Sequence, residues 1–395
     1  KIMNNKTKIY FLENSYNYNA LDLDTVKIAG SEKTLINITN KLAKDNKADV
    51  QQWFYFKLET TVGMLHKIRI INAGDSSFSN AWKGYKTVAS YDQKNWFRVD
   101  SHFDGNELVF LHTPEKPTIS YAYFTPYDYD RHQALIDMAK ASPLVSHTTL
   151  GLTKDNNPID LLTFGQEGKN KQKIWLIARQ HPGETMAQWF IEGVIKRLLI
   201  DDKTSTKLLS TCVFYIVPNM NPDGSVRGNH RTNSNGLNLN RQWASPSEID
   251  CPEVYYVRQA MHNKGVDLFL DIHGDEEIPY NFIMTGNTSC KLKKQANIFK
   301  DNFAKANTSF QLAVDYDTFH NEQSSCCGAT CGNASLDKAS FYIAEKFSCL
   351  SLILEMPFID DANDPDNQFG WSADRSMALG ESVLEPILLW RTEKK

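Results

Sequence analysis

The sequence lacks long apolar segments. No run of about 18 apolar residues, the length that marks a membrane-spanning helix, occurs in the 395-residue chain. Its first residues, Lys-Ile-Met-Asn-Asn, do not form the apolar core of a signal peptide. We therefore predict no membrane partner and take the cytoplasm as the default location.

Excess charge and cysteine are scarce as well. The chain has 43 Lys and Arg against 47 Asp and Glu, a net charge of -4, which gives no general attraction to nucleic acid. Its seven cysteines are an odd number scattered along the chain, unlike a secreted disulfide framework. One cluster, Cys326, Cys327 and Cys331, lacks the paired C-x-x-C units of structural zinc sites. A local disulfide is therefore favoured over a metal site there.

The remaining composition is that of an ordinary folded protein. Hydrophobic residues make up 41% of the chain and charged residues 23%, close to the globular average. A chain of 395 residues exceeds what one hydrophobic core usually organises. We therefore predict two domains.

Short strands and polar turns fill the first 125 residues. Between Met64 and Ile70, apolar residues alternate with Lys67 and Arg69, which is the pattern of a half-buried strand. Five more segments have strand character: 52–58, 85–91, 96–99, 107–111 and 119–124. This number of short strands predicts a β-sandwich domain over residues 1–125.

From residue 126 onward the periodicity changes. Residues 131–141 have helical spacing, and 377–390 predict a closing helix. Apolar runs predict buried strands at 174–178, 212–217, 266–272 and 350–356. Alternating strands and helices predict an α/β domain over residues 126–395, with a mixed, mostly parallel sheet and helices on both faces.

Metal-binding residue types stand where two of these strands end. His181 and Glu184 directly follow one strand, and His273 ends another. Ligands gather beyond the carboxyl ends of strands in such sheets. A His-Glu-His set leaves a fourth position open, as catalytic zinc sites do. Each residue alone is a weak signal, because a lone histidine is more often structural.

Two further features suggest carboxylate recognition and acid–base chemistry. Arg227, Arg231 and Arg241 lie in a loop rich in glycine and asparagine, and a guanidinium matches a carboxylate in geometry. A solvated basic loop is the alternative. Glu355 interrupts the apolar run Leu-Ile-Leu-Glu-Met-Pro, and a general base is one reason for such a position.

Six motifs together resemble the zinc metallocarboxypeptidases of the funnelin type, the peptidase family of carboxypeptidase A, and more closely their cytosolic carboxypeptidase branch. They are, in order, Ala-Arg-Gln-His-Pro-Gly-Glu-Thr, Asn-Pro-Asp-Gly, Gly-Asn-His-Arg, Leu-Asn-Arg-Gln-Trp, Asp-Ile-His-Gly-Asp-Glu and Leu-Glu-Met-Pro-Phe. The resemblance covers residues 126–395, and the strand-rich part before them looks like that branch's β-sandwich domain.

The resemblance implies an activity and a role for each motif. The substrates would be the C-termini of peptides or proteins, and one Zn²⁺ per chain would be held by His181, Glu184 and His273. Glu355 would be the general base and acid. The remaining motif residues would handle the substrate: Arg231 would polarise the scissile carbonyl, and Asn240 and Arg241 would hold the terminal carboxylate.

Two departures from the family pattern matter. Asn238 stands where the family usually has an aspartate that orients a zinc-binding histidine, which predicts weaker metal affinity. The pocket for the terminal side chain and its covering tyrosine should lie between about His320 and Tyr342. Lys338 is the nearest basic candidate there for an acidic side chain, since the cytosolic branch removes glutamate. A plain surface lysine is the alternative.

Two other functions remain open at this point. An amidohydrolase of the aspartoacylase type shares the H-x-x-E pattern and a later histidine. A non-catalytic binding protein could keep the same fold, although such a protein would often lose a ligand or the general base.

Overall fold

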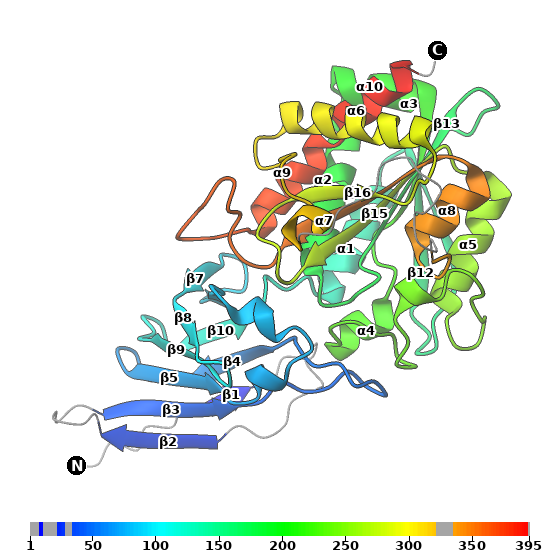
Figure 1. Ribbon diagram of the computed structural model, residues 1–395. Helices are drawn as coiled ribbons and strands as arrows, with labels where there is room; N and C mark the ends of the chain where they lie inside the picture. Colours follow the sequence, from blue (N-terminus) through cyan, green and yellow to red (C-terminus); the bar gives the residue numbers. More distant parts are fainter. Residues whose placement is uncertain (1–7, 11–21, 28–33, 321–334, 394–395) are drawn as a thin grey trace.

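The computed structural model describes residues 8–10, 22–27, 34–320 and 335–393. Its N-terminal part holds two five-stranded sheets (Figure 1). One has the order β1 (Lys8–Tyr10), β4 (Tyr55–Glu59), β10 (Thr118–Ala122), β6 (Thr87–Ser90) and β7 (Phe97–Val99). The other has the order β2 (Asp22–Lys27), β3 (Thr34–Asn40), β5 (Leu65–Ile70), β9 (Leu108–His112) and β8 (Ser101–Phe103). Each of the six segments predicted as strands overlaps one of these strands.

The second part is built on a seven-stranded mixed sheet. Its order is β11 (Val145–Leu152), β12 (Pro158–Phe164), β14 (Cys212–Val217), β13 (Gln172–Ala178), β15 (Leu268–Asp275), β17 (Leu350–Pro357) and β16 (Phe282–Thr285). The four central strands, β14, β13, β15 and β17, run parallel. The three outer strands pair antiparallel. The carboxyl ends of the central strands therefore meet at one edge.

Helices cover both faces of this sheet (Figure 1). Ile174 and Leu176 of β13 face a core shared with α1 (Tyr129–Lys140), α2 (Thr185–Leu198), α3 (Lys203–Thr211), α6 (Cys290–Ala306), α9 (Ala373–Ser382) and α10 (Leu384–Glu393). Trp175 and Ile177, which alternate with them, face α5 (Pro252–Lys264) and α8 (Ala339–Phe347). The continuous apolar run of β13 follows from burial on both faces.

Short helical segments lie in the connections: η1 (Ala73–Asp75), η2 (Ser79–Trp82), α4 (Pro222–Arg227), η3 (Leu239–Arg241) and α7 (Tyr316–Phe319). The predicted closing helix over 377–390 is wrong in one respect, because two helices, α9 and α10, occupy this region. Pro386 explains the break, since its ring has no N–H to donate and clashes with the carbonyl four residues earlier.

Two further sequence predictions concern the cysteine cluster and membrane-spanning helices. Cys326, Cys327 and Cys331 lie outside the described residues. Within the described part of the chain, no helix is both long and apolar enough to cross a membrane.

Candidate metal centre

Three side chains converge at the carboxyl edge of the central strands. His181 and Glu184 lie between β13 and α2, and His273 lies near the end of β15. The Nδ1 atoms of His181 and His273 lie 2.6 and 2.9 Å from the two oxygens of Glu184. All three residues are buried, and their ligand atoms fall within 4.8 Å of one another. The structure thus brings together the three residues predicted to hold the metal.

A tight turn after β13 sets the direction of His181. Arg179 has a left-handed backbone (φ 62°), a conformation that non-glycine residues adopt mainly where the surroundings enforce it. Its buried guanidinium donates to the carbonyls of Tyr127 and Pro182 and to the Gln188 side chain. The turn that carries the histidine is therefore held by contacts with residues before and after it in the chain.

The second nitrogen of each histidine faces its own acceptor. Nε2 of His181 lies 3.0 Å from Asn238 Oδ1 in a hydrogen bond. Nε2 of His273 lies 2.9 Å from Asp271 Oδ1, an ion-pair contact that does not have hydrogen-bond geometry. Gln180 donates to both oxygens of Asp271. Such partners orient metal-binding imidazoles. Asp271 was not predicted from the sequence, although a carboxylate two residues before a histidine in a buried strand shares its face.

Glu355 stands beside this group on β17, directly opposite His273 in the parallel register. Its Oε2 is buried and has no hydrogen-bond partner among the described residues. Burial raises the pKa of Glu355 well above its usual range, and the nearby positive charge of His273 partly opposes this. A cation bound at the three ligands would favour the ionised carboxylate.

The electrostatics of the ligands suit a cation. Burial would raise the pKa of Glu184, but His181 and His273 hold it below its usual range. Burial lowers the pKa of His181, which favours the neutral imidazole that metal ions require. Burial would also lower the pKa of His273, but Asp271 and Glu184 raise it well above its usual range, so a metal ion that binds there would displace a proton. Two imidazoles and one carboxylate, with an unpartnered carboxylate oxygen beside them, fit a catalytic zinc ion. They are the residues that would hold it.

Three basic side chains gather beside the candidate centre. Arg231 is half-buried, Arg241 is exposed, and Lys338 is half-buried at the start of α8. Burial and the charge of Arg231 lower the pKa of Arg241, and burial and both arginines lower the pKa of Lys338. Asn240 lies among them, and its Oδ1 accepts from the backbone N–H of Ala339 at 2.9 Å. Arg231, Arg241 and Lys338 form a basic cluster suited to an anionic ligand.

Arg227 and Tyr342 make contacts away from the metal-ligand candidates. Arg227 pairs with Asp155 at 2.7 Å. Tyr342 is the one tyrosine that the sequence has in the range 320–342. Its hydroxyl lies 2.9 Å from His262 Nε2 on α5. Neither contact involves the three metal-ligand candidates.

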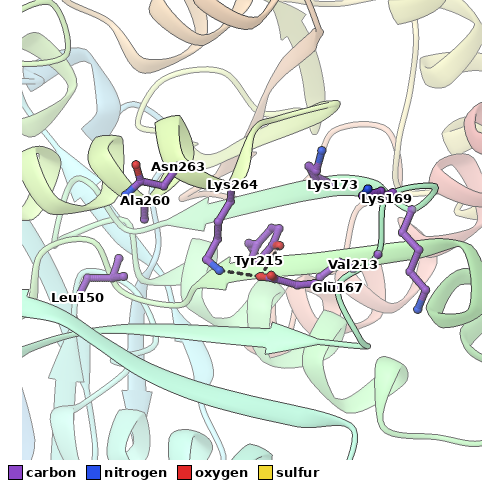
Figure 2. A pocket seen from close by; sticks show the side chains of 11 residues that line it. Leu150, Glu167, Lys169, Lys173, Val213, Tyr215, Ala260, Asn263 and Lys264 are labelled. Carbon is purple, nitrogen blue, oxygen red and sulfur yellow. Dashed lines mark hydrogen bonds and ion pairs between the residues drawn. The ribbon is translucent and has the colours of Figure 1, made fainter.

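A separate hollow of about 660 Å³ lies at the amino ends of β13 and β14 (Figure 2). Lys173, Tyr215 and Lys264 line it. Its carboxylate, Glu167, already receives Lys264 Nζ at 2.6 Å and the Tyr215 hydroxyl at 2.8 Å. Because it lies at the amino ends of these strands, the hollow is at the opposite end of the sheet from the metal-ligand candidates.

Comparison with known families gives two matches. Residues 132–370 match the family described as zinc carboxypeptidase. Residues 17–124 match the cytosolic carboxypeptidase N-terminal domain. Together the two matches cover most of the chain.

Individual relatives agree with these matches. An uncharacterised protein of Zymomonas mobilis is 38% identical over 349 residues, covering 87% of this chain and 88% of that protein. Bovine cytosolic carboxypeptidase 3 is 27% identical over 284 residues, or 63% of this chain. The chain spans only 28% of that longer protein.

Solved structures are similar over nearly the whole length. A metallo-carboxypeptidase from Burkholderia cenocepacia has a TM-score of 0.87 at 39% identity, covering 99% of this chain and 100% of that chain. A metallo-carboxypeptidase from Pseudomonas aeruginosa, solved with (2-guanidinoethylmercapto)succinic acid, has a TM-score of 0.87 at 36% identity, with 98% and 100% coverage.

Proposed function

Because the chain belongs to the zinc carboxypeptidase family and is a metallocarboxypeptidase, we propose that it removes the C-terminal residue from peptides or proteins. One zinc ion per chain would be held by His181, Glu184 and His273. The observation that carries this proposal is the convergence of their ligand atoms within 4.8 Å of one another. A bound zinc ion would supply Lewis-acid activation of water and of the scissile carbonyl.

Glu355 is the proposed general base and acid. It lies opposite His273 in the register of β15 and β17, so its carboxylate is next to the proposed reaction centre. It would take a proton from the attacking water and pass it to the leaving amine. Its Oε2 has no hydrogen-bond partner in the described part of the chain, which is consistent with a group that exchanges protons with substrate.

The basic cluster is the proposed substrate site. Asn240 and Arg241 would hold the terminal carboxylate. Arg231 would stabilise the negative charge that develops on the scissile carbonyl oxygen, an interaction made mainly in the transition state.

Preference for an acidic terminal residue is a finer part of the proposal and depends on Lys338. This lysine is half-buried and shares its surroundings with Arg231 and Arg241. The Pseudomonas aeruginosa structure contains a ligand with two carboxylates and a guanidino group, which supports binding of a terminal carboxylate but does not choose between acidic and basic terminal side chains. Lys338→Ala should lower the turnover of Glu-terminated relative to Leu-terminated peptides. Lys346→Ala, an exposed lysine on the same helix, should leave the ratio unchanged.

Domain boundaries and location complete the proposal. The division into residues 1–125 and 126–395 is supported by the two family matches, 17–124 and 132–370. A cytoplasmic location is supported by relatives named cytosolic carboxypeptidases.

The decisive experiment compares one peptide with a free and an amidated C-terminus, using the zinc-loaded chain. We expect release of the terminal residue only from the free form. Glu355→Gln should lower kcat roughly a thousandfold without loss of bound zinc. Hydrolysis of N-acyl amino acids but not of peptides would favour an aspartoacylase-type amidohydrolase. No hydrolysis of any substrate would favour a binding protein.

A further inference from the structure

A carboxylate from the N-terminal part of the chain holds the loop that carries Arg231. Asp45 is buried, and its oxygens accept four hydrogen bonds from three consecutive residues. They come from the backbone N–H of His230 (2.6 Å), Arg231 (2.8 Å) and Thr232 (2.9 Å), and from the Thr232 hydroxyl (3.0 Å). Converging backbone N–H groups form an anion-binding concavity, and Asp45 fills this one.

The residue next to Asp45 reinforces the same contact. The side chain of Asn229 donates to Asn46 Oδ1 at 2.7 Å and accepts from the Asn46 backbone N–H at 3.3 Å. The Asn46 amide also donates to the carbonyl of Ser234 at 2.8 Å. These bonds fix the loop on both sides of Arg231.

An aromatic ring from the same N-terminal part supports the Arg231 side chain. The guanidinium carbon lies 5.2 Å from the centre of the Phe78 ring, within the range of a cation–π contact. Phe78 also makes an edge contact with His230 at 5.8 Å. The ring of His230 is held in turn by Glu276, whose Oε1 lies 2.7 Å from its Nε2. Besides burial, the charge of Arg231 helps to lower the pKa of Arg241 and of Lys338, the other two members of the basic cluster.

We propose that Asp45 is a positioning residue for the reaction, which fixes the backbone of residues 230–232 so that Arg231 meets the scissile carbonyl. This inference rests on the role proposed for Arg231. It makes the N-terminal domain a part of the catalytic apparatus, since a small misplacement of a group that stabilises the transition state costs rate.

A carboxylate is required for this contact. In Asp45→Asn, an NH₂ group replaces one oxygen. If that group takes the place of Oδ2, it faces the N–H groups of Arg231 and Thr232, and if it takes the place of Oδ1, it faces that of His230. A donor facing donors leaves buried N–H groups without an acceptor. The loop would therefore shift, although the shape of the side chain is nearly unchanged.

The experiment uses the full zinc-loaded chain and a matched control. Asp45→Asn should lower kcat about tenfold or more, with KM unchanged because Asn240 and Arg241 keep their places. Zinc content is measured alongside and kcat is expressed per bound zinc, because the Gly183 N–H between two metal-ligand candidates donates to the His230 carbonyl at 2.8 Å. Asp104→Asn is the control. Asp104 also accepts two backbone N–H groups, those of Asn106 and Glu107, but within a hairpin of the N-terminal part. Its kcat should equal that of the unmodified chain.

A double-mutant cycle separates positioning from general damage. If Asp45 acts through Arg231, Asp45→Asn should lower kcat little further in an Arg231→Ala background. Full additivity of the two effects would overturn the inference, as would an Asp45→Asn variant with unchanged kcat. If Arg231→Ala alone leaves kcat unchanged, the proposed role of Arg231 fails, and the inference fails with it.

A second variant covers the case in which Asp45→Asn does not fold. Phe78→Leu keeps an apolar side chain under the guanidinium but removes the aromatic face. It should lower kcat severalfold without changing KM or bound zinc, and this loss should vanish in the Arg231→Ala background. Equal loss in both backgrounds would count against positioning by the N-terminal domain.

Discussion

At the residue scale, the partner of His181 determines how firmly metal would be held. Asn238 offers a neutral amide oxygen to Nε2 at 3.0 Å, whereas Asp271 offers a carboxylate to His273. A carboxylate makes an imidazole a stronger ligand, and outer-shell partners change metal affinity roughly 10- to 100-fold.

Asn238→Asp should therefore slow the loss of zinc to a chelator, by about tenfold. The rate of zinc release, followed with a chromogenic chelator, measures this without reference to activity. Asn235→Asp adds the same charge in the same loop, where its side chain contacts Lys154, and should not slow release. Equal release rates for Asn238→Asp and the unmodified chain would contradict the prediction.

Gly183, between two of the metal-ligand candidates, is a second critical residue. A Cβ there would lie 2.2 Å from Nδ1 of His230, and Glu276 holds that ring in place. Gly183→Ala should cost roughly 1–3 kcal/mol of unfolding free energy, measured by urea denaturation, and weaken zinc binding. Gly168→Ala, whose Cβ would have its nearest neighbour at 3.8 Å, should be neutral. A fully stable Gly183→Ala would show that the ring can move.

At the scale of elements, the central strands were predictable because burial on both faces makes them continuous apolar runs. The candidate centre was predictable too, because its motifs directly follow these recognisable strands in the sequence. The edge strand β11 was not predicted, because its residues are mostly exposed or half-buried and carry no clear period. Asp45 was not predictable either, since its partners lie about 185 positions away in the sequence and no local pattern reports such a contact.

Helix α5 carries a buried acid in its first turn. Glu253 is fully buried, and burial raises its pKa from 4.5 to about 7. Folding therefore favours the protonated form. Its contribution to stability is complete below pH 4.5 and is lost as the pH rises through about 7.

Glu253→Gln should remove this loss. At pH 8 the variant should exceed the unmodified chain in unfolding free energy by up to roughly 3 kcal/mol, and the two should converge near pH 4.5. Denaturant unfolding at both pH values measures the difference. Glu381→Gln, on the exposed side of α9, serves as the control. A constant difference between the variant and the unmodified chain across this range would contradict the assigned cause.

At the scale of the whole molecule, aromatic and polar contacts join the N-terminal sheets to the catalytic part. Tyr123 stacks on Phe358 with ring centres 4.6 Å apart. Arg98 of β7 donates to the carbonyls of Phe358 (2.8 Å), Trp371 (2.9 Å) and Phe369 (3.1 Å). Together with Asp45, these contacts imply that the two parts unfold as one unit.

Arg98→Met tests that coupling. Methionine keeps much of the length and apolar volume of the side chain but leaves several carbonyls without a donor, which should cost about 3 kcal/mol. We expect one calorimetric transition for the unmodified chain, and a lower or divided transition for the variant, because the loss falls on the contact between the parts. Arg69→Met removes an ion pair with Glu107 inside one sheet and should shift the transition only slightly without dividing it. An Arg98→Met variant that unfolds like Arg69→Met would place the coupling in the aromatic contacts and in Asp45 instead.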